Sequence, residues 1–380
     1  MWRRVNRLES VRPMVRIDEV CWEQFGDEVW GKATDPFLRS VETGLRQTLY
    51  QWRHMPADMV VDDCLWCPVA VSDSGYGLLE QSVTPRDVAK GARDFQPLIR
   101  SEADAEKILP PTVRADWEET GRRFERMQEV FGGILPVRRR GITSTWFAPW
   151  DRLTTFYGIE ELYQDMIDRP RVVHAAISRM TDAMLRLYEQ YERMGLLALN
   201  NGNVRVGSGG PGFTDELPQA DFDRRRVRMI DMWGNSTAQI FSEVSPAMHE
   251  EFALRYELRI LERFGLNCYG CCEPLHKKIG ILRRIPRLRK ISMSPFVNIA
   301  EGAAGIGQDF VYSAKPNPAV LAGQAWSEAV ARKNLRDILD GTRGLHVEII
   351  LKDIHTVRDE PRRLHEWSRV AMEMAEEYAA

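Results

Sequence analysis

The sequence predicts a single (β/α)₈ barrel preceded by an N-terminal helical extension. Short, apolar, β-branched runs alternate with amphipathic helical stretches, and this alternation indicates repeated βαβ units around a parallel sheet. The chain has 380 residues, of which 44% are hydrophobic, so it can bury one core of barrel size. We expect the extension over residues 1–57 and the barrel over residues 58–380.

The N-terminal half supplies the extension and the first barrel units. The extension is predicted to be helical because apolar residues recur every three or four positions, at Phe37, Val41, Leu45, Leu49 and Trp52. Residues 59–71 form a β-branched run and predict a strand. Residues 85–130 are polar and predicted to be helical, with a break at Pro110-Pro111. A strand over 134–147 and a long amphipathic helix over 171–193 follow.

The second half continues the alternation more regularly. An apolar strand beginning at Leu196 is expected to run into a loop rich in glycine and asparagine that ends near Gly212. The next stretch, 233–264, is predicted to be helical, with a restart at Ser245-Pro246. After it, strands are predicted over 266–273, 289–295, 309–318 and 346–356, and helices over 276–284, 299–305, 326–339 and 361–378.

Composition excludes several classes of function. The net charge of −3 gives no basic field for a nucleic acid or an anionic membrane. We find no uninterrupted apolar stretch of the roughly 20 residues that a membrane span needs. The arginine-rich N-terminus has no apolar segment after it and is not typical of a secretory signal. Six cysteines, two of them adjacent, are a poor disulfide framework, so we expect a cytoplasmic protein.

Polar groups follow the apolar part of five predicted strands. In a barrel of this type the active site lies at the carboxyl ends of the strands. We predict Asp353, Lys315 and Lys352 as catalytic residues, because ionisable groups at the end of an apolar run are costly unless they are paired or functional. A surface lysine is the alternative interpretation of Lys315. The residues predicted to bind substrate are Asn200, Asn201, Asn203, Ser294 and Trp146.

The densest cluster of candidate ligands is Cys268-Tyr269-Gly270-Cys271-Cys272-Glu273. Thiolates together with a carboxylate or an imidazole form a natural zinc site. We therefore predict a zinc ion held by Cys271, Cys272, Glu273 and His355. The alternative is that these cysteines are small buried residues of a strand.

A second cysteine pair, Cys64-x-x-Cys67, raises another alternative. It could join Cys268-x-x-Cys271 in a four-cysteine zinc or iron–sulfur site. However, the alternation of a strand places Cys64 and Cys67 on opposite faces, which favours simple packing.

The second half of the chain resembles the uroporphyrinogen decarboxylase superfamily, a (β/α)₈-barrel group that includes corrinoid-dependent and coenzyme M methyltransferases. The resemblance covers roughly residues 134–375. The matching features are Trp233-Gly234 with Gln239, the Ser245-Pro246 restart, Glu251-Phe252, Cys271 after an apolar strand, and Gly344 before the last strand.

Three departures from the family pattern affect what the resemblance implies. The methyltransferase branch carries a His-x-Cys zinc motif, and here Cys271 matches its cysteine whereas Tyr269 stands at the histidine position. The last-strand cysteine is replaced by the region of Lys352, Asp353 and His355. The N-terminal Gly-Arg-Tyr stretch of the decarboxylase branch is also missing, which argues against a true haem-pathway decarboxylase.

The resemblance implies a zinc-dependent methyltransferase that acts on a small-molecule methyl donor or acceptor, with a corrinoid carried by a partner protein. Asp353 is expected to contact one of the zinc ligands, without binding the zinc itself, and so to fix the orientation of that ligand. Two alternatives stay open. One is a metal-free decarboxylase or lyase that uses Asp353, Lys315 and Lys352 on a carboxylated substrate. The other is a module that binds a corrinoid or tetrapyrrole without catalysis.

Overall fold

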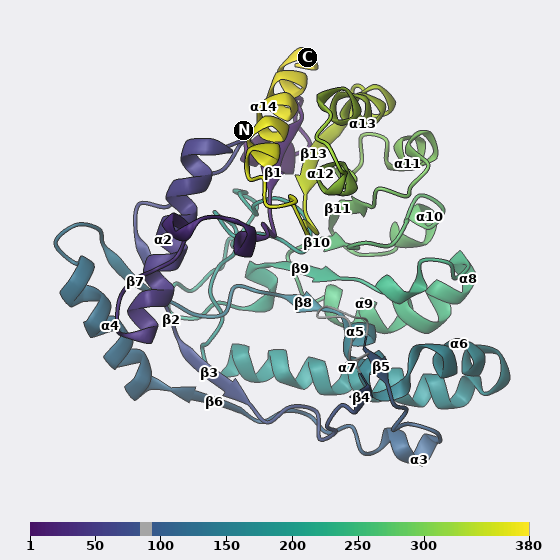
Figure 1. Cartoon of the computed structure of the whole chain (residues 1–380). Coiled ribbons are helices and arrows are strands. Elements are labelled where there is room, and N and C mark those ends of the chain that lie inside the picture. Colours follow the sequence, from purple (N-terminus) through teal and green to yellow (C-terminus); the bar gives the residue numbers. More distant parts are fainter. Residues whose placement is uncertain (84–92, 380) are drawn as a thin grey trace.

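A computed structural model describes residues 1–83 and 93–379 of the chain. Its centre is a seven-stranded sheet in the order β1-β13-β12-β11-β10-β9-β8, in which every pair of neighbours is parallel (Figure 1). The strands of this sheet are β1 (Met14–Ile17), β8 (Trp146–Phe147), β9 (Trp233–Ser236), β10 (Leu266–Tyr269), β11 (Leu288–Met293), β12 (Val311–Ala314) and β13 (His346–Leu351). Because all of them run the same way, their carboxyl ends share one side of the sheet, which we call the carboxyl edge.

Three two-stranded sheets lie outside the central one: a parallel pair β2–β7 and antiparallel pairs β3–β6 and β4–β5. Their strands are β2 (Leu65–Pro68), β3 (Ala70–Asp73), β4 (Ser82–Val83), β5 (Asp94–Phe95), β6 (Val113–Asp116) and β7 (Val137–Arg140). This arrangement is a mixed α/β fold with a parallel central sheet, the class that the alternating sequence pattern predicts. Among the described residues the sheet has seven strands, with β1 and β8 at its two ends, rather than the eight of the predicted barrel.

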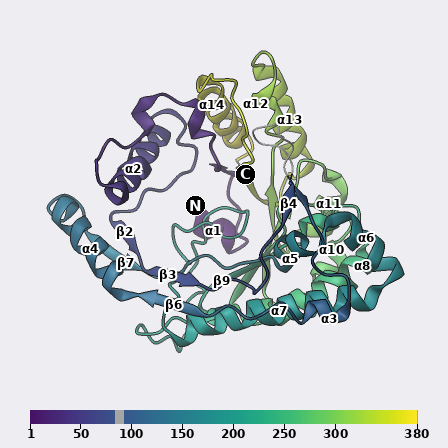
Figure 2. The same cartoon turned by 60° about the horizontal axis from the view of Figure 1, so that its bottom comes forward.

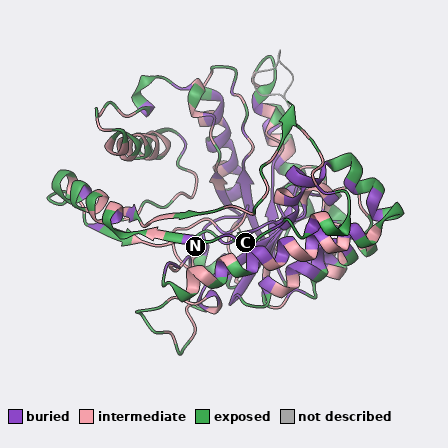
Figure 3. Ribbon diagram, turned by 90° about the horizontal axis from the view of Figure 1, so that it is seen from below, coloured by how far each residue is buried: buried purple, intermediate pink, exposed green. Residues whose placement is uncertain are grey.

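The described residues form fourteen α-helices, most of which surround the outer face of the central sheet. They are α1 (Trp2–Asn6), α2 (Pro36–His54), α3 (Glu102–Ala105), α4 (Trp117–Phe131), α5 (Pro149–Tyr157), α6 (Ile159–Asp168), α7 (Pro170–Arg193), α8 (Pro246–His249), α9 (Arg255–Leu261), α10 (Ile279–Leu282), α11 (Ile299–Ile306), α12 (Ala319–Ala322), α13 (Glu328–Gly341) and α14 (Arg362–Glu377). A π-helical turn, η5 (Glu250–Leu254), joins α8 to α9. Buried residues concentrate on the central strands and on the helix faces turned toward them (Figure 3).

One flank of the molecule is built differently. Helices α2 and α4 lie side by side with the β2–β7 pair, away from α6 and α8 (Figure 2). No residue of α2 is fully buried, although the helix has the apolar spacing that the sequence predicts. Cys67 packs in this flank against Met127 and Val137, which is the packing role expected for the Cys64-x-x-Cys67 pair.

The inner face of the sheet combines apolar clusters with a buried pair of charges. Lys290 of β11 and Glu348 of β13 form an ion pair of 2.8 Å, and both side chains are fully buried. The backbone N–H of Gly210 donates to the same carboxylate at 3.1 Å. A Cβ atom at Gly210 would overlap the Trp2 ring of α1, so only glycine lets the backbone pass between that ring and Glu348. The glycine-rich loop is thus a packing element.

The structure differs from the predicted elements at several places. The stretch 85–130, predicted to be helical, contains β5 and β6 as well as α3 and α4, because β6 pairs with β3. Residues 1–57 contain α1 and α2 but also β1, which pairs with β13 from the other end of the chain. Trp233–Ser236 is a strand instead of the start of a helix, because hydrogen bonding to both β8 and β10 overrides its local preference. Leu197 makes only an isolated parallel bridge with Ile142. Part of the helix predicted over 85–130 falls on 84–92, outside the described residues.

Among the residues that the structure describes, no helix has the length and apolar character required to cross a membrane.

Candidate active site

Two adjacent thiols lie at the carboxyl edge, directly after β10. The chain turns at Gly270, whose φ of +94° is a conformation that glycine adopts without strain. This turn brings Cys271, which is 5% exposed, beside the exposed Cys272, with their Sγ atoms 3.5 Å apart. The pair therefore combines one sheltered thiol with one accessible thiol.

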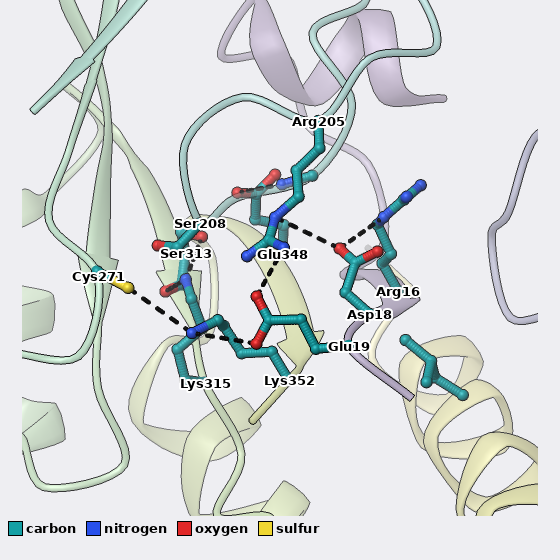
Figure 4. A network of polar contacts seen from close by, with 12 residues as sticks. Arg16, Asp18, Glu19, Arg205, Ser208, Cys271, Ser313, Lys315, Glu348 and Lys352 are labelled. Atoms are coloured by element: carbon teal, nitrogen blue, oxygen red, sulfur yellow. Dashed lines mark hydrogen bonds and ion pairs between the residues drawn. The ribbon is translucent and has the colours of Figure 1, made fainter. Parts of the chain in front are cut away.

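The ammonium of Lys352 lies in the middle of this cluster. Lys352 follows β13, and its side chain is only 4% exposed. Its Nζ lies 3.7 Å from each Sγ, 2.8 Å from Asp353 Oδ2 and 3.6 Å from Glu19 Oε2. Figure 4 shows Lys352, Cys271 and Glu19 converging from three different segments of the chain. The single Lys352 ammonium therefore lies close to two sulfurs and two carboxylates.

The charges of this cluster act on the two thiols in opposite directions. The hydrogen bond from Cys272 and the charge of Lys352 lower the pKa of Cys271, although burial opposes them. The same contact, together with burial, raises the pKa of Cys272 well above the ordinary thiol value. Burial tends to lower the pKa of Lys352, but the Cys271 sulfur and Asp353 outweigh it and keep the pKa raised. Of the two thiols, Cys271 is therefore the one whose ionisation is favoured, with Cys272 as its hydrogen-bond donor and the charged Lys352 beside it.

The two carboxylates of the cluster are held by unusual backbone. Asp353 has a φ of +56° and Glu19 a φ of +52°, values that cost non-glycine residues about 1–3 kcal/mol and that concentrate at functional sites. The Asp353 N–H donates to Glu19 Oε2 at 3.1 Å, and Arg205 Nη1 donates to Glu19 Oε1 at 2.8 Å. The contacts join three distant segments and hold both carboxylates beside Lys352.

Two cavities meet at the sulfur pair. The smaller, of about 340 Å³, has Pro295, Phe296, Pro318, Ala322 and Lys315 in its wall. The larger, of about 620 Å³, is lined by more polar groups, among them Thr143, Thr145, Gln239, Arg205 and Glu19. Cys271, Cys272 and Asp353 line both. Two molecules, or the two ends of one molecule, can therefore reach Cys271 from different sides.

The four predicted zinc ligands are brought only partly together. Cys271, Cys272 and His355 line the smaller cavity. Glu273 is fully buried and turned away: it accepts hydrogen bonds from Thr237 Oγ1 at 2.7 Å, Ala238 N at 3.2 Å and Cys271 N at 2.8 Å. Its role in this arrangement is to hold the turn that carries the thiols.

The residues of the edge do not fit a zinc ion as they are arranged. Within residues 1–83 and 93–379, no group of three or more histidine, cysteine, aspartate or glutamate side chains has the spacing to hold a metal. The position between Cys271, Cys272 and Asp353 is taken by the Lys352 ammonium. An internal cation therefore neutralises the sulfurs where a metal ion would otherwise do so.

The predicted substrate-binding residues divide into two groups. Trp146 lines the larger cavity, and Ser294 lines a small cavity of about 190 Å³ that also reaches Lys315. The asparagines are engaged in loop contacts instead. Asn200 bonds to Thr143 and Trp233, Asn201 to Leu217, and Asn203 to Val60 and Asp62.

Sequence reasoning missed Glu19, Arg205, Gln239 and Asp151. The first three line the larger cavity, and Gln239 Nε2 donates to Asp151 Oδ2 at 3.0 Å. Burial raises the pKa of Asp151. Glu19 carried no signal because it follows β1, a four-residue strand inside a segment with helical spacing.

Comparison with known proteins finds a solved structure whose fold is similar to that of this chain. No protein family model matches the chain, and no curated protein matches its sequence. A methyltransferase from Methanosarcina mazei is similar in structure, with a TM-score of 0.53 and 10% sequence identity; the match covers 97% of this chain and 96% of that one. At 10% identity the likeness shows the fold alone, over nearly the whole length of both chains.

Proposed function

We propose that the protein is a methyltransferase in which the Cys271 thiolate, stabilised by Lys352, prepares the methyl acceptor. The observation that carries the proposal is the position of Cys271, 3.7 Å from the Lys352 ammonium and at the junction of two cavities. The structural likeness to a methyltransferase over nearly the whole chain supports the same reaction class.

The proposed reaction needs a donor, an acceptor and a base. The acceptor is a thiol or another protonated nucleophile, Nu–H, and it enters one cavity while the donor CH₃–X enters the other. Cys271 takes the proton of Nu–H, the nucleophile forms a bond to the methyl carbon, and X leaves with the electron pair of the C–X bond. Lys352 keeps Cys271 ionised before the step and stays charged after it, and a positioned base of this kind contributes about 10²–10⁴-fold to rate.

The zinc predicted from the sequence plays no part in this proposal, because the arranged side chains do not fit it. The corrinoid partner predicted from the resemblance is retained as the source of the methyl group. A corrinoid held by another protein would present its methyl group at the open side of the larger cavity, where Trp146 is 36% exposed.

The test is methyl transfer from methylcobalamin to 2-mercaptoethanol, followed by the visible spectrum of the corrinoid. We expect turnover by the native chain and a loss of about 10²-fold or more in Cys271→Ser. Cys64→Ser, which alters a buried cysteine elsewhere, is the matched control and should keep full activity. Equal rates in Cys271→Ser and the native chain would contradict the proposal.

Metal analysis of the same preparations tests the sequence-based zinc prediction separately. Stoichiometric zinc in the native chain that disappears in Cys271→Ser would show that the thiols rearrange around a metal. A corrinoid spectrum that changes on binding, without turnover, would favour the binding module instead.

A metal-free decarboxylase or lyase is the second candidate. It is favoured by two buried lysines, Lys315 and Lys352, which reach the two cavities from neighbouring strands and could pair with a substrate carboxylate. Release of CO₂ from a supplied carboxylic acid, unaffected by Cys271→Ser, would support this candidate against the first.

A further inference from the structure

Lys315 differs from the other buried lysines of the sheet. Lys290 is paired with Glu348 and Lys352 with Asp353, each at 2.8 Å. Lys315 is 4% exposed, yet within the described part of the chain no carboxylate lies within ion-pair distance of it. An ammonium in this position would be buried without a counter-ion, which is costly.

The hydrogen bonds of Lys315 suit a neutral amine. Its Nζ donates to the Ser313 carbonyl oxygen at 2.9 Å and to Ser313 Oγ at 2.8 Å. A neutral amine has two N–H groups and one lone pair. Since both N–H groups can be used on Ser313, the lone pair is left for the cavity that Lys315 lines.

Burial makes this neutral state more accessible, although an amine with a pKa of about 8 is still mostly protonated at pH 7. Burial is the main cause that lowers the pKa of Lys315, to about 8; the nearby Lys352 ammonium acts in the same direction, and Glu348, Cys268 and Cys271 oppose it. Compared with the ordinary value of 10.5, this raises the fraction of free amine at neutral pH by about two orders of magnitude.

We propose that Lys315 is an imine-forming nucleophile, and that the smaller cavity takes an aldehyde or ketone whose carbonyl carbon carries an apolar or aromatic substituent. The substituent would lie against Phe296, Pro318 and Ala322. A cavity of about 150 Å³ holds a benzene ring, so about 340 Å³ has room for one ring and the reacting group.

The covalent step balances without a redox partner. The Nζ lone pair attacks the carbonyl carbon, and a proton passes from nitrogen to the carbonyl oxygen. The resulting carbinolamine then loses one molecule of water, formed from its hydroxyl group and the remaining N–H proton, and leaves a C=N bond. This chemistry is independent of the methyl transfer proposed above, because it uses neither the Cys271 thiolate nor a methyl donor.

The test traps the imine in the native chain. Benzaldehyde and sodium cyanoborohydride are added, the reducing agent converts the imine to N-benzyl-lysine, and peptide mass spectrometry locates the modified lysines. Two internal controls are available: Lys352 is equally buried but paired, and the side chain of Lys333 is 76% exposed. We expect Lys315 to be labelled about tenfold or more faster than either control at neutral pH.

Labelling of Lys315 should also rise with pH through about 8, since the amine must lose its proton first. Lys315→Arg should remove the fast phase, and Cys271→Ser should keep it, which separates this result from failure of the methyl-transfer proposal. The inference is overturned if Lys315 is labelled no faster than Lys333 in the native chain, a comparison that requires no variant to fold.

Discussion

Two groupings of lysine and carboxylate that both include residues on or directly after β13 have opposite characters. Lys290 and Glu348 are sealed inside the sheet, with the Gly210 N–H as a further donor. Lys352, Asp353 and Glu19 stand at the carboxyl edge, where two cavities and two thiols reach them. The same residue types stabilise the fold where they are sealed, and at the edge, where a cavity opens onto them, the lysine helps to lower the pKa of Cys271.

The largest expected effect comes from breaking the sealed pair. Glu348→Gln leaves the Lys290 ammonium buried without its counter-charge, and loss of one partner of a buried pair costs about 3–5 kcal/mol. Urea unfolding followed by circular dichroism measures it. Asp353→Asn, at the open edge, is the control and should lower the free energy of unfolding much less. Equal losses in the two variants would remove the distinction between the groupings.

A sealed carboxylate that has no ion-pair partner among the described residues sharpens the comparison. Glu257 is fully buried, accepts a hydrogen bond from Tyr269 at 2.7 Å, and burial raises its pKa to about 8. By contrast, Lys290 keeps the pKa of Glu348 low despite burial. Because the folded state holds the Glu257 proton more tightly, its contribution to stability is complete below about pH 4.5 and is lost as the pH rises through about 8.

The slope of this loss is at most about 1.4 kcal/mol per pH unit for one proton. Urea unfolding of the native chain and of Glu257→Gln between pH 5 and pH 8 tests it, a range set by the ordinary and the raised pKa. We expect the variant to lose this part of the pH dependence. If the free energy of unfolding depends on pH as steeply in Glu257→Gln as in the native chain, other groups are responsible for the pH dependence.

The smallest effect is expected at the rim of the smaller cavity. Phe296 is 75% exposed, so Phe296→Ala should change the free energy of unfolding by no more than about 0.5 kcal/mol. It should nevertheless slow benzyl labelling of Lys315, because an apolar contact with the aldehyde is lost. Val330→Ala, at another exposed apolar position, controls for general surface effects and should leave the labelling unchanged.

The carboxyl edge could be predicted from sequence because parallel strands bring their ends together. Cys271, Lys315 and His355 follow three different apolar runs, and the structure places all three on one cavity. That reasoning needs only strand positions and direction. It also gave the mixed α/β class with a parallel sheet, which the structure and the likeness to a solved methyltransferase support.

The parts that sequence could not give depend on turns and on distant contacts. Glu273 follows the thiols directly, but the turn at Gly270 directs its carboxylate to Thr237 and away from the cavity. Glu19 reaches the edge only because β1 pairs with β13, more than 300 residues further along the chain. The local sequence of a four-residue strand does not predict which distant strand it will pair with.

Alkylation of Cys271 by iodoacetamide as a function of pH, in the native chain and in Lys352→Met, tests the central claim most directly. Removing the ammonium 3.7 Å from the sulfur should raise the pKa of Cys271, so the midpoint of alkylation should move upward by about one pH unit, or tenfold in rate at neutral pH. Identical pH profiles for the two proteins would contradict the claim that the Lys352 ammonium lowers the pKa of Cys271.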